Sequence, residues 1–232
     1  AGCMTTEAGN GPAGTAEARF GHVEYRGVEP PQPPEGMFRN PVLPGFHPDP
    51  SIERVGDDFY LVSSTFSWFP GVPVFHSRDL VNWRLIGHAI TRESQASFRG
   101  LGTNRGIFAP TISWHDGKFY LVTTCIECGD NFYVTATDPA GPWSEPVWLD
   151  FDGIDPSLFF DDDGRAWMVN NGPPVGEPLY EGHRAIWIQE FDVESGQLTG
   201  PRKMIVDGGV NLDEEPIWAE GPHIYKVDGW YY

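Results

Sequence analysis

From Phe38 onward, short apolar runs alternate with polar turns along the whole chain. The runs are rich in Val, Ile, Phe, Tyr and Trp, and Asp-Gly, Pro-Gly and Gly-Pro pairs separate them. Short runs bounded by turn residues are typical of β-strands, and no stretch keeps a helical period of apolar positions for long. The pattern therefore predicts an all-β domain.

A loose repeat organises these strands into four units. Each unit opens on a proline, a polar residue and an aliphatic residue, and an Asp-containing turn with an aromatic strand follows roughly ten residues later. The openings are Asp49-Pro50-Ser51-Ile52, Ala109-Pro110-Thr111-Ile112, Asp155-Pro156-Ser157-Leu158 and Glu220-Gly221-Pro222-His223-Ile224. Second hairpins are expected at residues 72–90, 132–149 and 185–206, which gives each of the first three units about four strands.

Units of four strands, about 40–60 residues long, indicate the blades of a β-propeller. A blade cannot bury both of its faces alone, so blades close into a ring around a central channel. A β-sandwich is the competing architecture, but it gives no reason for one opening to recur before each aromatic hairpin. The chain is expected to hold about three blades and the start of a fourth.

Three of the four openings carry a carboxylate, namely Asp49, Asp155 and Glu220, whereas the second has Ala109. The innermost strand of each blade lines the channel of a propeller, so these openings should meet at one rim. Converging acids repel one another, and folding alone gives no reason to collect them. The alternative is that Asp before Pro only starts a turn, and that acids stand at these openings by coincidence.

The charge of the chain limits its partners. Among 232 residues, 33 are Asp or Glu and 15 are Lys or Arg, which gives a formal net charge of −18. This excess argues against nucleic acid and anionic membrane surfaces as partners, because both attract Lys and Arg. No apolar stretch approaches the ~20 residues of a transmembrane helix. Residues 1–36 are rich in Gly, Ala, Glu and Pro and are expected to form a leader or linker ahead of a domain at 37–232.

The three cysteines are Cys3, Cys125 and Cys128. The last two form a Cys-x-x-Cys pair at the expected end of a hairpin, and no second pair completes a zinc site. Two free thiols are the preferred interpretation, ahead of a local disulfide and of a redox motif. The start Ala1-Gly2-Cys3 is similar to the end of a bacterial lipoprotein cleavage box and, with the linker, favours an extracytoplasmic location.

Longer motifs resemble glycoside hydrolase family 43, in that family's order, from about Phe38 to Tyr232. They are NPVLPGFHPDPS (40–51), STFSWFPGV (64–72), HSRDLVNW (76–83), GIFAP (106–110), IDPSLF (154–159) and AEGPHIYK (219–226). The resemblance is closest to β-xylosidases and α-L-arabinofuranosidases. It implies a five-bladed β-propeller that hydrolyses terminal β-D-xylosyl or α-L-arabinofuranosyl residues of xylo-oligosaccharides or arabinoxylan-type substrates with inversion.

Carried over position by position, the resemblance implies that Asp49 is the general base and Glu220 the general acid. Asp155 would hold the acid in place and tune its proton affinity. An inverting glycosidase needs two carboxyl groups roughly 6.5–9.5 Å apart, which leaves room for water. The apolar approach at residues 217–219 is expected to disfavour ionisation of Glu220. Phe66 and Phe108 are expected at the sugar subsite, although many relatives have Trp where Phe108 stands.

The resemblance also implies parts that lie outside this chain. A fifth unit is absent and the fourth only begins, so the complete protein is expected to be longer. No cofactor is expected to be required, and a structural calcium in the channel would take its ligands from the missing stretch. The sequence specifies neither the oligomeric state nor the choice between xylosidase and arabinofuranosidase.

Two other functions remain open. A fructan-cleaving propeller hydrolase works by retention, which places its two main carboxyl groups about 5–5.5 Å apart. A non-catalytic sugar-binding propeller would use the same carboxylates only as hydrogen-bond acceptors. Turnover and the anomer of the released sugar separate these three functions.

Overall fold

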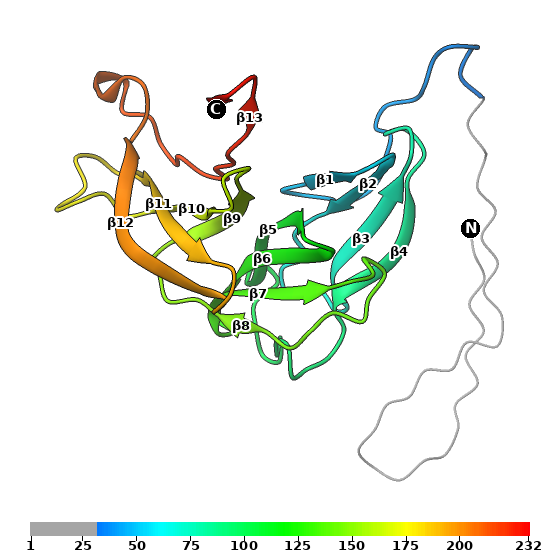
Figure 1. Ribbon diagram of the computed structural model, residues 1–232, viewed down its shortest axis with the longest axis horizontal. Helices are drawn as coiled ribbons and strands as arrows, with labels where there is room; N and C mark the ends of the chain where they lie inside the picture. Colours follow the sequence, from blue (N-terminus) through cyan, green and yellow to red (C-terminus); the bar gives the residue numbers. More distant parts are fainter. Residues whose placement is uncertain (1–31) are drawn as a thin grey trace, which may run out of the picture. The chain divides into compact units, whose positions relative to one another are not determined.

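The computed structural model describes residues 32–232, and residues 40–232 form one compact unit. In this part of the chain there are fourteen strands and a single turn of 3₁₀ helix, η1 (Leu212–Glu214). Twelve strands form three sheets of four, and the last two pair as a separate hairpin (Figure 1). The prediction of an all-β fold with four-stranded units is thus confirmed.

Each sheet follows the order of its strands in the sequence. The first sheet contains β1 (Ser51–Val55), β2 (Asp58–Val62), β3 (Gly71–Ser77) and β4 (Arg84–Ile90). The second contains β5 (Gly106–His115), β6 (Lys118–Ile126), β7 (Asp130–Ala136) and β8 (Val147–Trp148). The third contains β9 (Ile154–Phe160), β10 (Ala166–Gly172), β11 (Ala185–Asp192) and β12 (Gln197–Asp207), and the last hairpin is β13 (Lys226–Val227) with β14 (Trp230–Tyr231). Each predicted unit is one sheet, and its second hairpin is the pair of outer strands.

Asp-Gly pairs form tight turns in these hairpins. Asp116 and Gly117, between β5 and β6, have φ values of 45° and 80°, and Asp228 and Gly229, between β13 and β14, have 52° and 81°. Two-residue turns with positive φ at both positions match the twist of antiparallel strands, and Asp and Gly tolerate that conformation. This requirement explains why the pair recurs ahead of the aromatic strands.

The second sheet is buried on both faces. Leu121 of β6 belongs to the apolar cluster shared with the first sheet, whereas its neighbours Tyr120 and Val122 belong to the cluster shared with the third. Successive side chains of a strand point to opposite faces, so a strand with apolar residues at consecutive positions packs between two sheets. The sheets are therefore stacked face to face, as blades are in a propeller.

In each of the first three openings, a small polar residue forms a hydrogen bond to the next unit. The three bonds are Ser51 Oγ accepting from the Ile112 N–H (3.2 Å), Thr111 Oγ1 donating to the Pro156 carbonyl (2.9 Å) and Ser157 Oγ donating to the Pro222 carbonyl (2.7 Å). Strands β1, β5 and β9 and the segment before β13 consequently lie beside one another in that order (Figure 1). The repeated polar position therefore brings the openings together.

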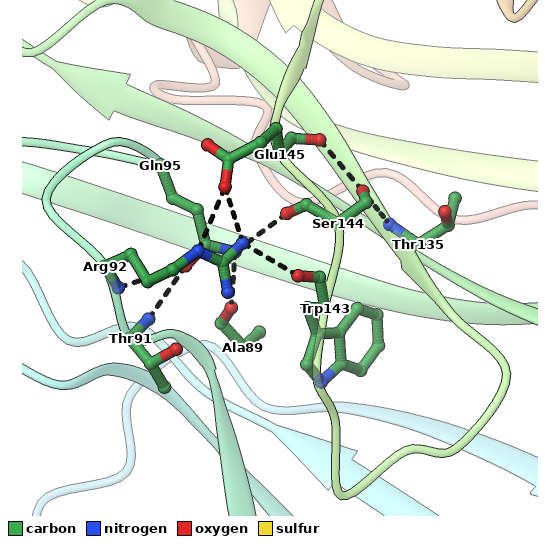
Figure 2. A network of polar contacts seen from close by, with 8 residues as sticks. All are labelled: Ala89, Thr91, Arg92, Gln95, Thr135, Trp143, Ser144 and Glu145. Carbon is green, nitrogen blue, oxygen red and sulfur yellow. Dashed lines mark hydrogen bonds and ion pairs between the residues drawn. The ribbon is translucent and has the colours of Figure 1, made fainter.

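A buried glutamine holds the loop after β4 against the second sheet (Figure 2). All four hydrogen-bonding positions of the Gln95 amide are used. Its Oε1 accepts from the N–H groups of Thr91 (2.9 Å) and Arg92 (3.2 Å), and its Nε2 donates to the carbonyls of Ala89 (3.1 Å) and Ser144 (2.8 Å). Arg92 adds an ion pair with Glu145 at 2.8 Å. The network fixes the connection between the first two sheets.

Cys125 and Cys128 are joined by a disulfide across the turn between β6 and β7. The expectation of two free thiols is therefore wrong, and the local disulfide, the second interpretation, is what the structure contains. The turn brings the two Cα atoms to 5.2 Å, a separation that a disulfide spans. Cys3 and most of the expected leader lie outside the described residues. In the described part, no helix has the length and hydrophobicity needed to cross a membrane.

Candidate active site

The openings of the four units meet at one pocket of about 530 Å³. Asp49, Asp155 and Glu220 all line it. The other lining residues are Pro50, Ser51, Ile52, Ala109, Pro110, Thr111, Gly221, His223 and Tyr225. The volume is within the range of small-ligand sites, and its wall is built almost entirely from the repeated openings.

The first three openings share an unusual backbone conformation. Asp49, Ala109 and Asp155 have φ values of 52°, 28° and 54°. A residue before proline normally adopts an extended conformation, and non-glycine residues rarely occupy the left-handed region. Such strain persists only where the surrounding structure holds it, and it is concentrated at functional sites. The first three openings therefore share a strained backbone conformation as well as similar residue types.

Asp155 is the buried acid of the pocket, with 7% of its surface exposed. Its Oδ2 accepts hydrogen bonds from Asn171 Nδ2 (2.7 Å) and from the Gly221 N–H (3.2 Å). Burial raises the pKa of Asp155 to about 6; the hydrogen bond from Gly221 opposes this shift, and the charges of Glu220 and Asp49 add to it. Asp155 is thus a carboxyl group that titrates close to neutral pH.

Asn171 and Arg184 form a second layer behind Asp155. Arg184 donates two hydrogen bonds to Asn171 Oδ1, from Nε at 3.1 Å and from Nη2 at 2.7 Å. These bonds fix the amide so that its Nδ2 donates to Asp155. A Cβ on Gly153 would lie 1.9 Å from the Asn171 carbonyl oxygen, so glycine is required for this close approach. Asn171 belongs to none of the motifs that predicted site residues, and its signal in the sequence is a polar pair, Asn170-Asn171, inside an otherwise apolar strand.

Asp49 and Glu220 are more exposed than Asp155. Oδ2 of Asp49 accepts a hydrogen bond from Ser64 Oγ at 2.5 Å. Residues 217–219 do not form the apolar cover on which the expected effect on Glu220 depended, because Ile217 and Trp218 are themselves 64% and 55% exposed. The segment before Glu220 lies on the surface instead of packing over its carboxyl group, and Asp155 is the pocket acid that burial affects.

Phe66 and Phe108 lie next to each other but do not line the pocket. Their rings meet edge to face with centroids 5.3 Å apart, and Phe46 lies 6.0 Å from Phe66. Backbone hydrogen bonds between Phe66 and Ile107 bring the two aromatic segments together beside the second opening. Their expected contact with a sugar stays a prediction.

Of the five titratable side chains that line the pocket, three are carboxyl groups, which suit acid–base chemistry. Within residues 32–232, no group of three or more His, Cys, Asp or Glu side chains has an arrangement that could hold a metal ion. Calcium ligands were expected only outside the chain, and that expectation is untested.

Stacked four-stranded sheets with acids gathered at their inner openings define a propeller-type protein with an acidic pocket. The sequence profile of glycosyl hydrolases family 43 matches residues 38–232. The chain belongs to this family.

Two curated relatives illustrate the similarity. The chain is 54% identical over 199 residues to a xylosidase/arabinosidase of Butyrivibrio fibrisolvens, with 84% of this chain and 38% of that protein covered. It is 42% identical over 199 residues to a non-reducing end α-L-arabinofuranosidase of Bacteroides ovatus, with 84% and 35% covered.

Solved structures agree with this assignment. A xylan β-1,4-xylosidase from Bacillus halodurans is 45% identical, with a TM-score of 0.76, and the match covers 84% of this chain and 38% of that one. The chain thus spans somewhat more than a third of the length of these relatives.

Proposed function

We propose that this protein is a glycoside hydrolase that releases terminal β-D-xylosyl or α-L-arabinofuranosyl residues from xylan-type oligosaccharides with inversion. The single observation that carries the proposal is the meeting of Asp49, Asp155 and Glu220 in one pocket of a family 43 member. The printed activities of the relatives, xylosidase/arabinosidase and α-L-arabinofuranosidase, support the substrate class. In this proposal the described sheets are blades of a five-bladed β-propeller whose inner strands surround the pocket.

Asp49 is the general base in this proposal. It accepts a proton from the water molecule that attacks the anomeric carbon of the terminal sugar. Its position on the pocket wall and the hydrogen bond that orients its Oδ2 support this role. The strained backbone at Asp49 supports it further, because such strain is held where a side chain must be placed accurately.

Glu220 is the general acid, and Asp155 supports it. The Gly221 N–H that donates to Asp155 belongs to the residue after Glu220, so Asp155 holds the backbone on which the acid stands. The charge of Glu220 adds to the rise in the pKa of Asp155, so the two carboxyl groups lie close enough to interact. In this proposal Glu220 supplies the proton that the leaving oxygen takes up.

The reaction balances with Asp49 and Glu220 as the two groups that transfer protons. The oxygen of water forms a bond to the anomeric carbon while the bond from that carbon to the leaving oxygen breaks. The proton of the attacking water goes to Asp49, and the proton of Glu220 goes to the leaving oxygen. The products are a pentose of inverted anomeric configuration and the shortened oligosaccharide or alcohol.

The test is hydrolysis of 4-nitrophenyl β-D-xyloside and 4-nitrophenyl α-L-arabinofuranoside by the full-length protein. We expect turnover of at least one of them, and a loss of about 10²- to 10⁴-fold in Asp49→Asn, the range for removal of a general base. Asp57→Asn changes an exposed acid in the turn between β1 and β2 and should keep full activity. Binding of xylo-oligosaccharides without turnover, or turnover of fructosides only, contradicts the proposal.

A further inference from the structure

Ser64 is a buried serine that links the first and second openings. It lies just after β2, and 1% of its surface is exposed. Its Oγ lies 2.5 Å from Asp49 Oδ2 and accepts a hydrogen bond from the Ala109 N–H at 2.6 Å. The Ser64 N–H also donates to the carbonyl of Pro48 at 3.0 Å, which anchors the serine to the chain directly before Asp49.

The donor groups determine the direction of the hydrogen bonds that join Ala109, Ser64 and Asp49. A hydroxyl group has one proton, and a backbone N–H can only donate. Because Ala109 donates to Ser64 Oγ, the serine proton is free to be donated to the Asp49 carboxylate. Hydrogen bonds to an ionised acceptor are the strong ones, and this bond sets the orientation of the whole carboxyl group.

Ala109 explains the opening that lacks an acid. It has the same left-handed backbone as Asp49 and Asp155, although alanine gains nothing by that conformation. The paired backbone of Phe66 and Ile107 brings the Ser64 segment beside β5. The second unit thus contributes a backbone donor at the position where other units contribute a carboxylate.

We propose that Ser64 is a positioning residue. It accepts a hydrogen bond from the Ala109 N–H and holds Asp49 in the orientation required of the general base. This inference rests on the proposed function, because it assigns a supporting group to one of its catalytic residues. Asp155, Glu220, His223 and Tyr225 are the other titratable groups on the pocket wall.

Ser63 provides a matched control. It precedes Ser64, it is fully buried, and within residues 32–232 its hydroxyl group has no hydrogen-bond partner. Ser63→Ala and Ser64→Ala therefore remove the same atom from adjacent buried positions. Only the second variant removes a hydrogen bond to Asp49.

Steady-state kinetics test the inference. We expect Ser64→Ala to lower kcat by about 10- to 100-fold, the effect of one hydrogen bond to a charged group, with KM changed less than about threefold. Ser63→Ala should match the wild type, and Ser64→Thr, which keeps the hydroxyl group, should recover most of the lost kcat. Equal losses in the two alanine variants, or an unchanged Ser64→Ala, overturn the inference.

A second measurement does not depend on turnover. The Asp49 carboxyl carbon is observed by ¹³C NMR at a single pH in protein labelled at aspartate, and its signal is assigned by its absence in Asp49→Asn. Ser64→Ala should change the chemical shift of this carbon, because the hydrogen bond to its Oδ2 is lost, and Ser63→Ala should leave the chemical shift in place. Identical chemical shifts in both variants overturn the role of Ser64 even in an active enzyme. An inactive wild type with the expected chemical shifts contradicts the proposed function alone.

Discussion

Replacing Asp155 by Asn should stabilise the folded protein at neutral pH. The carboxyl group is 7% exposed, and burial raises its pKa from the ordinary 3.8 to about 6. Asn has nearly the same shape and keeps an oxygen that accepts from Asn171 and Gly221. The substitution therefore removes the cost of a buried negative charge while the hydrogen bonds to this side chain can remain.

The size of this gain in stability follows from the difference between the pKa of Asp155 in the folded protein and its pKa in the unfolded chain. Between pH 3.8 and about 6 the unfolded chain releases the proton of Asp155 while the folded protein keeps it. The free energy of unfolding of the wild type therefore falls as the pH rises through this window, by up to about 3 kcal/mol. The free energy of unfolding of Asp155→Asn does not fall in this way, because Asn carries no proton that titrates. Its gain over the wild type should be largest above pH 6, at up to about 3 kcal/mol, and smallest near pH 4.

Asp161 is the matched control, because it has the same 7% exposure and the opposite electrostatic environment. Hydrogen bonds from Lys226 Nζ and the Tyr231 hydroxyl group, both at 2.5 Å, lower the pKa of Asp161 to about 2. Its ionised form stabilises the folded protein above pH 3.8, and this contribution is lost as the pH falls through about 2. Asp161→Asn should therefore be less stable than the wild type at pH 7.

The assay is urea unfolding of the wild type and both variants at several pH values between 4 and 7.5. We expect Asp155→Asn to gain stability and Asp161→Asn to lose it at pH 7, with the gain growing as the pH rises. Asp155→Asn should also lose activity, since the group that supports Glu220 is changed. An Asp155→Asn variant that is less stable than the wild type at pH 7, or whose gain in stability does not depend on pH, refutes this reasoning.

Two further predictions concern the acid and the fold. Glu220→Gln should lose about 10²- to 10⁴-fold on alkyl or phenyl glycosides and much less on dinitrophenyl glycosides, because only poor leaving groups need the proton. Equal losses on both substrates would exclude the acid role. Gln95→Leu should lower the free energy of unfolding by about 3 kcal/mol, since the buried Ala89 carbonyl and three partly buried backbone groups lose their hydrogen bonds to this side chain. Activity per folded molecule should stay unchanged, and chemical denaturation together with kcat normalised to the folded fraction checks both statements.

The repeat made the fold predictable, because strand period and turn chemistry are local properties. Asp-Gly pairs specify two-residue turns, and consecutive apolar residues such as those around Leu121 specify a strand buried on both faces. Four openings of similar composition then sufficed to predict which acids would lie near the inner strands. The number of blades and the closure of a ring are not determined by these local rules and stay predictions.

The partners of the acids were not predictable in the same way. Asn171 and Ser64 are ordinary polar residues in the sequence, and they acquire a role only because the folded chain brings Asp155 and Asp49 within hydrogen-bond distance. The apolar residues before Glu220 do not give it an apolar cover, since burial depends on which distant surface covers a segment and Ile217 and Trp218 are exposed. The disulfide was underrated because a Cys-x-x-Cys pair alone does not specify its oxidation state.

The most direct measurement is the anomeric configuration of the sugar first released from an aryl β-D-xyloside, or from an aryl α-L-arabinofuranoside if that is the substrate. Proton NMR during the first minutes of hydrolysis separates the two anomers before mutarotation mixes them. Attack by water activated at Asp49, with Glu220 protonating the leaving oxygen, predicts α-xylose or β-arabinose as the first product. Initial release of the anomer that matches the substrate would contradict the roles given to the pocket carboxylates.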